Sequence, residues 1–285
     1  MKDLKDKAIL ITGAASGIGR ATAIAFARKG ANPVILVDIN PQGLSETASE
    51  LGRIGSNPVP YTIDVGDFEA IEGMVNEVIE RFGRIDVLVN VAGVSLICPV
   101  EKLELADWER VLNVDLWGVI NTITAIYPQM IERRTGHIVN VASTDGLFTP
   151  GLYYSGPYCA AKSAVVGLSE NLLYEAMFHG IAVTCVCPGA VDTPILHSTP
   201  VKGLPPEIIE EANRLYDPFK EAPEDTASAI VKAVEKEKFL LITTPLMKTA
   251  YFARRHFPWL WFMAMKATSR SLKKMVDKAS KASIA

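Results

Sequence analysis

Short apolar runs alternate with longer segments of helical spacing through the first 190 residues. The runs are rich in valine and isoleucine, and they are Ala8–Thr12, Val34–Asp38, Val59–Asp64, Val87–Asn90, Ile138–Ser143 and Val183–Cys187. The segments with helical spacing are Gly17–Lys29, Pro41–Leu51, Phe68–Phe82, Ala106–Met130 and Tyr158–Phe178. Runs that are apolar on both faces are typical of strands covered by helices on each side of a sheet. The alternation predicts an α/β fold in which right-handed crossovers join parallel strands.

The alternation becomes weaker after Pro188. Four prolines between residues 192 and 206 predict an irregular loop. We expect short helices at Pro206–Leu215 and Pro223–Lys236 and a last strand at Phe239–Thr244. The sequence therefore predicts one domain over residues 1–244, with a substrate loop at about 193–222. Residues 245–285 form a C-terminal extension without this alternation, and we expect its end, from residue 273 onward, to be frayed.

The composition is typical of a folded globular protein. Hydrophobic residues make up 49% of the 285 residues and charged residues 21%, which argues against disorder. The four cysteines have no extracellular framework spacing, so a disulfide scaffold is not expected. The first residues lack the basic segment and apolar run of a signal peptide. We therefore expect a cytoplasmic protein.

The net charge of −3 is divided unevenly along the chain. Residues 245–285 carry nine lysines or arginines and one aspartate, a balance of +8, which leaves −11 on the other 244 residues. The aromatic run Phe257–Met265 is too short to cross a bilayer, which needs about 20 residues. Its rings and the basic residues beside it are compatible with peripheral contact with a membrane through residues 245–274. Burial in a subunit interface, or closure over a pocket, is the alternative, and nucleic-acid binding is not expected.

A glycine-rich turn, TGAASGIG, follows the first predicted strand and opens a helix. Glycines let the backbone approach a ligand closely, and the free N–H groups at a helix N-terminus attract an anion. The order of strand, turn and helix predicts a site for the pyrophosphate of a dinucleotide, although a purely structural turn is the alternative. The predicted cofactor contacts here are Gly13, Ser16, Gly17, Ile18 and Gly19.

The second predicted strand ends at Asp38, about twenty residues further along the chain. A carboxylate at this place bonds the ribose hydroxyls of NAD and repels the 2′-phosphate of NADP. No lysine or arginine lies between Gly13 and Gly19, so we expect NAD(H) as the cofactor. Arg20 and Arg28 are near enough in the sequence to leave NADP(H) as the alternative.

Tyr158 and Lys162 lie four residues apart in a predicted helix and therefore share one face of it. An ammonium group beside a phenol favours the phenolate and lowers the pKa of the tyrosine. The pair predicts a general acid in ketone reduction and a general base in alcohol oxidation. An ordinary pair on a helix surface would show the same spacing.

Because these motifs occur together and in order, the chain resembles a short-chain dehydrogenase/reductase of the branch with a TGxxxGxG turn and a YxxxK helix. The match runs from about residue 5 to about residue 195. The resemblance implies a single doubly wound (Rossmann) domain whose sheet of seven parallel strands is flanked by helices. It also implies hydride transfer between nicotinamide C4 and a carbonyl or alcohol carbon. A homodimer or homotetramer, formed through the Ala106–Met130 and Tyr158–Phe178 helices, is expected on the same ground.

The resemblance adds functional positions to those read from the residues. Asn113 matches the family's catalytic asparagine, which holds a water that links Lys162 to solvent. Ser143 matches the serine that bonds the substrate oxygen, so the expected catalytic set is Asn113, Ser143, Tyr158 and Lys162, with Tyr158 and Lys162 also touching the cofactor. Val91 replaces the second asparagine of the NNAG motif, which affects packing beside the adenosine. Further cofactor contacts are implied at Asp64, Val65, Asn90, Ala92, Gly93, Pro188, Gly189, Val191 and Thr193.

The segments expected to set specificity are apolar and aromatic with little charge. The candidate pocket residues are Ser95, Ile97, Cys98, Phe148, Tyr153, Tyr154, Ile195 and Leu196. Such a lining suits a hydrophobic secondary alcohol or ketone better than a sugar phosphate or a carboxylic acid.

We therefore expect an NAD(H)-dependent oxidoreductase that interconverts a hydrophobic secondary alcohol and its ketone without a metal. An NADPH-dependent ketone or 3-oxoacyl reductase of the same family is one alternative, and a non-catalytic dinucleotide-binding scaffold is another. A scaffold would need none of the four catalytic residues, so their presence together favours an enzyme.

Overall fold

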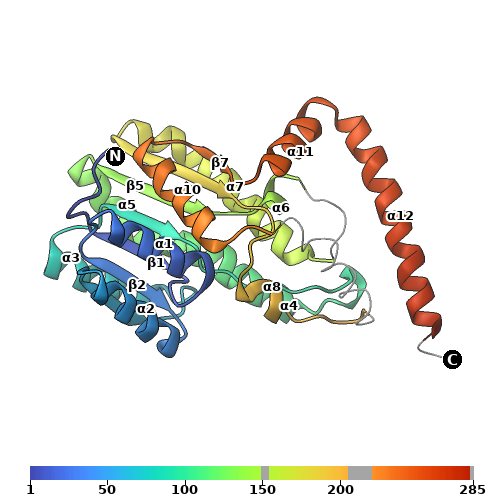
Figure 1. Cartoon of the computed structure of the whole chain (residues 1–285), viewed down its shortest axis with the longest axis horizontal. Helices are drawn as coiled ribbons and strands as arrows, with labels where there is room; N and C mark the ends of the chain where they lie inside the picture. Colours follow the sequence, from blue (N-terminus) through green and yellow to red (C-terminus); the bar gives the residue numbers. More distant parts are fainter. Residues whose placement is uncertain (149–153, 205–219, 283–285) are drawn as a thin grey trace.

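The computed structural model describes residues 1–148, 154–204 and 220–282. The predicted sheet of seven parallel strands is confirmed, in the order β3-β2-β1-β4-β5-β6-β7 (Figure 1). Its strands are β1 (Ile9–Thr12), β2 (Val34–Asp38), β3 (Pro58–Thr62), β4 (Val87–Asn90), β5 (Gly136–Val141), β6 (Ile181–Cys187) and β7 (Leu240–Ile242).

The strand order reverses direction between β1 and β4. The chain runs outward from β1 to β3, returns to β4 on the other side of β1, and then continues to β7. At such a switch point, the loops at the carboxyl ends of two neighbouring strands lead away in opposite directions. This leaves a crevice in which doubly wound proteins bind their ligands.

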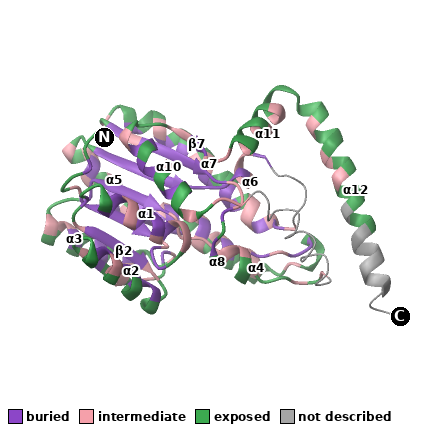
Figure 2. Ribbon diagram, in the orientation of Figure 1, coloured by how far each residue is buried: buried purple, intermediate pink, exposed green. Residues whose placement is uncertain are grey.

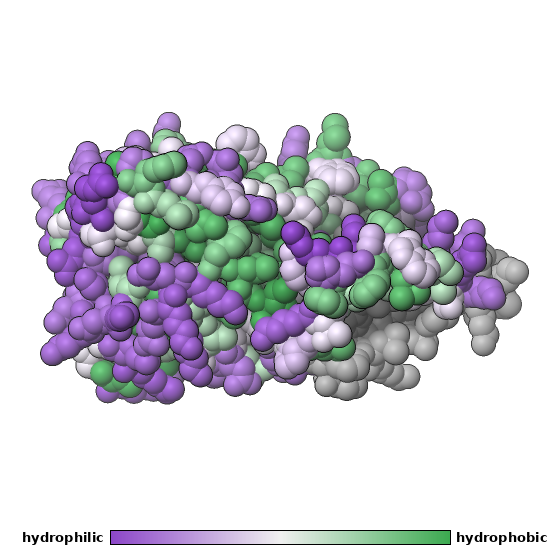
Figure 3. Space-filling model, turned by 90° about the horizontal axis from the view of Figure 1, so that it is seen from above, coloured by the Kyte–Doolittle hydropathy of each residue, from purple (hydrophilic) through white to green (hydrophobic). Residues whose placement is uncertain are grey.

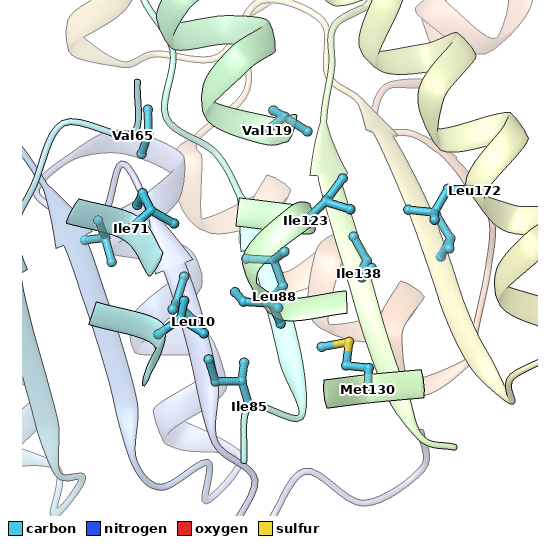
Figure 4. Close-up of a cluster of buried hydrophobic side chains, with 14 of the residues drawn as sticks. Leu10, Val65, Ile71, Ile85, Leu88, Val119, Ile123, Met130, Ile138 and Leu172 are labelled. Carbon is cyan, nitrogen blue, oxygen red and sulfur yellow. The ribbon is translucent and has the colours of Figure 1, made fainter. Parts of the chain in front are cut away.

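Two layers of helices cover the sheet. One face packs against α1 (Gly17–Arg28), α2 (Pro41–Arg53) and α10 (Pro223–Glu235), and the other against α3 (Phe68–Phe82), α5 (Gly118–Arg133) and α7 (Gly156–Met177). Alternate strand residues supply the two cores: Ile9 and Ile11 face the first layer, and Leu10 faces the second (Figure 4). The central strands β1, β4 and β5 are buried along their whole length between the layers, whereas the edge strand β3 is partly exposed (Figure 2).

The predicted helix at Ala106–Met130 is divided in the structure. Helix α4 (Leu105–Leu112) is followed by a π-helical turn, Asn113–Trp117, and then by α5. In this wider turn the N–H of Gly118 donates to the carbonyl oxygen of Asn113, five residues back. A π turn inserts one extra residue, and such turns often occur at functional sites. This one brings Asp115 into the interior, where it is completely buried.

The C-terminal half departs further from the expectation. A short helix, α8 (Pro194–Ser198), begins inside the predicted irregular loop because proline is favourable at the first helical position. The predicted helix at Pro206–Leu215 lies outside the described residues.

The C-terminal extension, for which no helix was expected, forms α11 (Pro245–His256) and α12 (Pro258–Ala282). Helix α12 therefore continues past residue 273, from which fraying was expected. Thr244 caps α11 by accepting a hydrogen bond from the N–H of Met247, and alanine, lysine and methionine favour helix in α12. No described helix has the length and hydropathy needed to cross a bilayer.

A chain of buried side-chain hydrogen bonds crosses the sheet and joins α5 to α7. The hydroxyl of Thr122 donates to the amide oxygen of Asn90 at 2.7 Å. Asn90 donates to Asn140 at 2.9 Å, and Asn140 donates to the hydroxyl of Ser169 at 3.0 Å. All four side chains are buried, so each partner satisfies a group that water cannot reach. The chain fixes two helices and two strands next to the carboxyl edge of the sheet.

We predict that Asn140→Ala lowers the free energy of unfolding by about 2 kcal/mol, because the buried amide N–H of Asn90 loses its acceptor and the hydroxyl of Ser169 loses a donor. Urea denaturation followed by circular dichroism measures the effect. Asn171→Ala, at an exposed position of α7, is the control and should change stability by less than about 0.5 kcal/mol. Equal stability of the two variants would contradict the role given to this chain of hydrogen bonds.

Candidate active site

The ammonium group of Lys162 is buried near the carboxyl ends of β4 and β5. Lys162 is 3% exposed and lies 3.1 Å from a carboxylate oxygen of Asp115. It donates a hydrogen bond to the carbonyl oxygen of Val141, at the end of β5, at 3.2 Å. Its nitrogen also lies 5.5 Å from the centre of the Tyr158 ring. The geometry therefore brings Tyr158 and Lys162 together, as their spacing predicts.

Asp115 supplies the counter-charge for this lysine. Its other carboxylate oxygen accepts a hydrogen bond of 2.7 Å from the N–H of Val94. Burial raises the pKa of Asp115, whereas the charge of Lys162 and the bond from Val94 oppose this effect. Gly93 lies directly against the pair, since a Cβ there would be 3.0 Å from the carboxylate. A side chain at that position would disturb the ion pair.

The phenol of Tyr158 is held in its protonated form. Burial raises the pKa of Tyr158, and the negative charges of Asp115 and Asp145 raise it further, while a hydrogen bond with Ser143 lowers it. The net shift of the Tyr158 pKa is therefore upward, opposite to the direction expected from Lys162 alone. The ammonium faces the ring and is paired with Asp115, so its charge is largely neutralised.

Ser143 is positioned by the short helix α6 (Thr144–Leu147). It is the N-cap residue, and its hydroxyl oxygen accepts a hydrogen bond of 3.1 Å from the N–H of Asp145. Gly146 lets α6 pack directly on α7, because a Cβ there would lie 2.5 Å from the carbonyl oxygen of Lys162. This close packing brings the Ser143 hydroxyl to Tyr158.

Asp145 is a second carboxyl group near the phenol. Burial raises the pKa of Asp145 to about 6. Its charge acts on Tyr158, so the protonation states of the two groups are linked. From the sequence, the pocket was expected to carry little charge, and Asp145 was not named as a functional residue. Its position two residues after Ser143, at the start of a short helix, was the available signal.

The structure does not bring the Asn113 side chain to Lys162. Asn113 is exposed and lies against Gly66, after β3. Asp115, two residues further, takes the place beside Lys162. The signal that was missed is periodicity: Val111, Asp115 and Val119 recur every four residues on the buried face, and Asn113 does not belong to that face.

The glycine-rich turn has the shape that a dinucleotide needs. Gly13 and Gly17 adopt positive φ angles of 66° and 51°, and a Cβ on Gly13 would lie 2.9 Å from the backbone of Ala92. A Cβ on Gly19 would collide with the backbone oxygen of Gly13. Ser16, the N-cap of α1, makes no side-chain capping bond, so the first N–H groups of α1 face the turn without a side-chain acceptor.

Asp38 supports this turn from the end of β2. Its carboxylate accepts hydrogen bonds of 3.0 Å from the N–H groups of Ala15 and Asn40. Arg20 forms ion pairs with two glutamates of α2, Glu46 at 3.2 Å and Glu50 at 3.4 Å.

The remaining predicted cofactor residues lie at the carboxyl ends of strands. Asp64 accepts from the N–H of Gly66, and the carbonyl oxygen of Val65 accepts from Asn121. Asn90 has a different environment from the one expected, because its amide belongs to the buried chain between α5 and α7. The other predicted contacts at these ends are Ala92, Gly93, Pro188, Gly189, Val191 and Thr193. Their roles stay predictions.

The loop after β6 reaches back to the glycine-rich turn. A Cβ on Gly17 would lie 3.0 Å from the methyl group of Thr193. The carbonyl oxygen of Pro188 accepts a hydrogen bond from the N–H of Thr144 at 3.0 Å, which ties this loop to α6. The predicted cofactor and catalytic residues are thereby joined along one edge of the sheet.

Three separate segments meet around the predicted pocket. Ile97 bonds through its backbone to Pro200 and Lys202, and the N–H of Cys98 donates to the carbonyl oxygen of Tyr154. Cys98 is completely buried in a small cluster that includes Tyr158, and burial raises the pKa of its thiol. Ser95, Ile195 and Leu196 are half-buried. Tyr153 lies outside the described residues.

Phe148 brings the C-terminal extension to this region. It is buried, and its ring meets the ring of Trp261 edge to face, with the centres 5.3 Å apart. Sequence reasoning left the position of the extension open, and the structure places one of its rings beside a predicted pocket residue.

Comparisons with known proteins agree with this arrangement. A family model for the short chain dehydrogenases matches residues 7–202. The 3-oxoacyl-[acyl-carrier-protein] reductase FabG of Thermotoga maritima is 39% identical over 200 residues, which cover 70% of this chain and 80% of that protein. The probable oxidoreductase EphD of Mycobacterium tuberculosis is 35% identical over 272 residues, which cover 93% of this chain and 45% of that protein.

A solved structure shows the same fold over almost the whole length. The short chain dehydrogenase/reductase of Burkholderia phymatum, crystallised in complex with NAD, has a TM-score of 0.81 and 28% identity. The match covers 91% of this chain and 96% of that one. By its sheet, its family match and its relatives, the chain belongs to the short-chain dehydrogenase/reductase family.

Proposed function

We propose that the protein is an NAD(H)-dependent oxidoreductase that interconverts a hydrophobic secondary alcohol and its ketone. The observation that carries the proposal is the group formed by Tyr158, Ser143 and the buried Lys162–Asp115 ion pair. A buried ammonium costs free energy unless it is paired, so a protein without use for it would not be expected to keep it. This favours an enzyme over a scaffold that only binds a dinucleotide.

Ser143, Tyr158 and Lys162 each have a separate role in the proposed reaction. A bound nicotinamide would accept the hydride from an alcohol or supply it to a ketone. The Ser143 hydroxyl orients the substrate oxygen, and Tyr158 takes its proton in oxidation or donates one in reduction. Lys162 places an ammonium group beside the phenol, and the part of its charge that Asp115 does not offset stabilises the negative charge that develops on Tyr158 during the transfer.

The preference for NAD(H) rests on the surroundings of the turn. Asp38 presents a carboxylate at the end of β2, where the 2′-phosphate of NADP would be repelled. Arg20, the nearest cation to this turn in the sequence, is engaged by Glu46 and Glu50. The similar structure from Burkholderia phymatum was solved with NAD.

The substrate class rests on the apolar side chains of the predicted pocket. Leu96, Cys98 and Val111 cluster with Tyr158, and the ring of Phe148 meets the ring of Trp261. Among the described residues, the carboxyl groups whose charges act on the phenol are Asp115 and Asp145. A hydrophobic alcohol or ketone fits this lining. The relative from Thermotoga maritima is a 3-oxoacyl reductase, so a 3-oxoacyl thioester with NADPH is the second candidate and belongs in the substrate panel.

We predict that Tyr158→Phe lowers kcat/KM for alcohol oxidation by at least about a hundredfold, because the group that takes the proton is removed. The assay follows NADH formation by absorbance with a panel of apolar secondary alcohols. Tyr174→Phe, at an exposed position of the same helix, is the matched control and should keep wild-type activity. Retained turnover in Tyr158→Phe would refute the proposed mechanism.

For cofactor choice, we predict that Asp38→Asn raises kcat/KM for NADP at least about tenfold while NAD is still accepted, because the repulsive charge is removed and one of the two acceptor oxygens is retained. Initial rates with both cofactors measure the ratio. Glu72→Gln, an exposed change of equal charge in α3, should leave the ratio unaltered. Wild-type turnover with NADP alone would overturn the assignment to NAD.

For the dependence on pH, we predict that Asp145→Asn moves the rate profile of alcohol oxidation to lower pH. Oxidation becomes faster as Tyr158 loses its proton, and the negative charge of Asp145 raises the pKa of Tyr158. Removing that charge lowers the pKa, and the ionisation of Asp145 near pH 6 disappears from the profile. Profiles of kcat/KM that superimpose for variant and wild type would disprove the coupling.

A further inference from the structure

The C-terminal extension forms a two-helix arm, which we define as α11 and α12. The arm leads away from the sheet, and its long second helix ends far from the rest of the chain (Figure 1). One face of α12 is directed inward: Trp261, Met265 and Thr268 recur at helical spacing and are half-buried. The edge-to-face contact of Trp261 with Phe148 anchors this face near the predicted pocket.

The opposite face of α12 carries a different set of side chains. Trp259, Phe262 and Met263, in its first turns, are 65%, 55% and 62% exposed. Lys266 and Arg270 follow on the same line of the helix, seven and eleven residues after Trp259, and are also exposed. We call these five residues the outer stripe.

Apolar exposure extends around the elbow between the two helices. Phe252, Phe257 and Leu260 are 56%, 49% and 51% exposed. Seen from above, hydrophobic side chains lie at the surface on the side of the molecule where the arm begins, beside hydrophilic ones (Figure 3). Large exposed apolar patches are uncommon on proteins that have no partner for them. The elbow therefore has the character of an interaction surface.

The charge of the arm indicates the kind of partner. Residues 245–274 contain seven lysines or arginines and no acidic residue, whereas residues 1–244 carry −11. The guanidinium group of Arg254 lies 4.8 Å from the centre of the Phe262 ring, so cation and aromatic surface are presented together. Aromatic rings beside cations suit the boundary between lipid headgroups and acyl chains.

We propose that the outer stripe docks the arm on an anionic phospholipid bilayer. Trp259, Phe262 and Met263 enter the headgroup region at the elbow, and Lys266 and Arg270 bind lipid phosphates further along the helix. The acidic body is repelled by the same surface, which orients the molecule with its arm toward the lipid. The inward face of α12 keeps its contact with Phe148.

A second copy of the chain is the competing occupant of this surface. Exposed apolar side chains also occur outside the arm, on the π turn and at the C-terminal end of α7, and they are Trp117, Tyr174, Met177 and Phe178. The mixture of rings and cations in one exposed stripe fits a lipid surface better than the apolar centre of a subunit interface, from which lysine is depleted. Docking itself does not depend on the proposed reaction.

The test is co-sedimentation of the full-length protein with vesicles of phosphatidylcholine, with and without phosphatidylglycerol. We expect binding to the anionic vesicles, weak binding to the neutral ones, and release at high salt. The double variant Lys266→Glu/Arg270→Glu should lower binding at least about thirtyfold, since each basic residue near the surface contributes about fivefold. The triple variant Trp259→Ser/Phe262→Ser/Met263→Ser should also lose binding.

The matched control is Lys232→Glu/Lys236→Glu, which reverses two exposed charges, one on α10 and one at its C-cap, and should bind like the wild type. Circular dichroism checks that each variant is folded, and sedimentation velocity without lipid gives the oligomeric state. Absence of binding to anionic vesicles, or equal loss in the control, overturns the proposal. Dissociation of an oligomer by the triple variant, with vesicle binding intact, would also overturn it, in favour of a second copy.

Discussion

The site depends on a lysine that is buried beside a phenol and therefore needs a counter-charge. Lys162 is 3% exposed, and an unpaired ammonium at such a depth is strongly unfavourable. Asp115 supplies the negative charge, and the π-helical turn before α5 brings it into the interior. Gly93 leaves room for the pair, and Val141 accepts a further bond from the lysine. Four separate parts of the chain thus meet at one ion pair.

The surrounding fold holds these parts in place. The buried chain of hydrogen bonds through Asn90 and Asn140 ties α5, which follows Asp115, to α7, which carries Lys162. Helix α6 packs closely on α7 and fixes Ser143 next to Tyr158. Burial and two nearby carboxyl groups then keep the phenol protonated. The charge state of the site is therefore a property of the packing rather than of the tyrosine and lysine alone.

Much of the fold could be predicted from the sequence, because strands that are buried on both faces leave a clear pattern of apolar runs. The glycine-rich turn and the spacing of Tyr158 and Lys162 were similarly readable, since each reflects local geometry. Asn113 was expected to hold a water that links Lys162 to solvent, whereas the structure places its side chain against Gly66 and places Asp115 beside the lysine. Asp115 was on the buried face, but a π turn and an ion pair between distant segments are not visible in local spacing.

The residues around the predicted pocket were harder to predict, because their properties also depend on contacts between distant segments. Asp145 acquires its raised pKa from burial that only the packing of α6 creates. The two helices of the extension were missed because their sequence has no strand–helix alternation, although its residues favour helix. The contact between Trp261 and Phe148 joins segments more than a hundred residues apart and leaves no trace in either segment.

The most direct test of the central claim is an ultraviolet titration of tyrosinate in the wild type and in Asp115→Asn, each with Tyr158→Phe added as its reference. The account predicts that Tyr158 in the wild type ionises well above the ordinary value of about 10. In Asp115→Asn a negative charge is removed and Lys162 is no longer neutralised, so Tyr158 should ionise at lower pH. The same titration curve for Tyr158 in both backgrounds would contradict the claim that the ion pair governs the phenol.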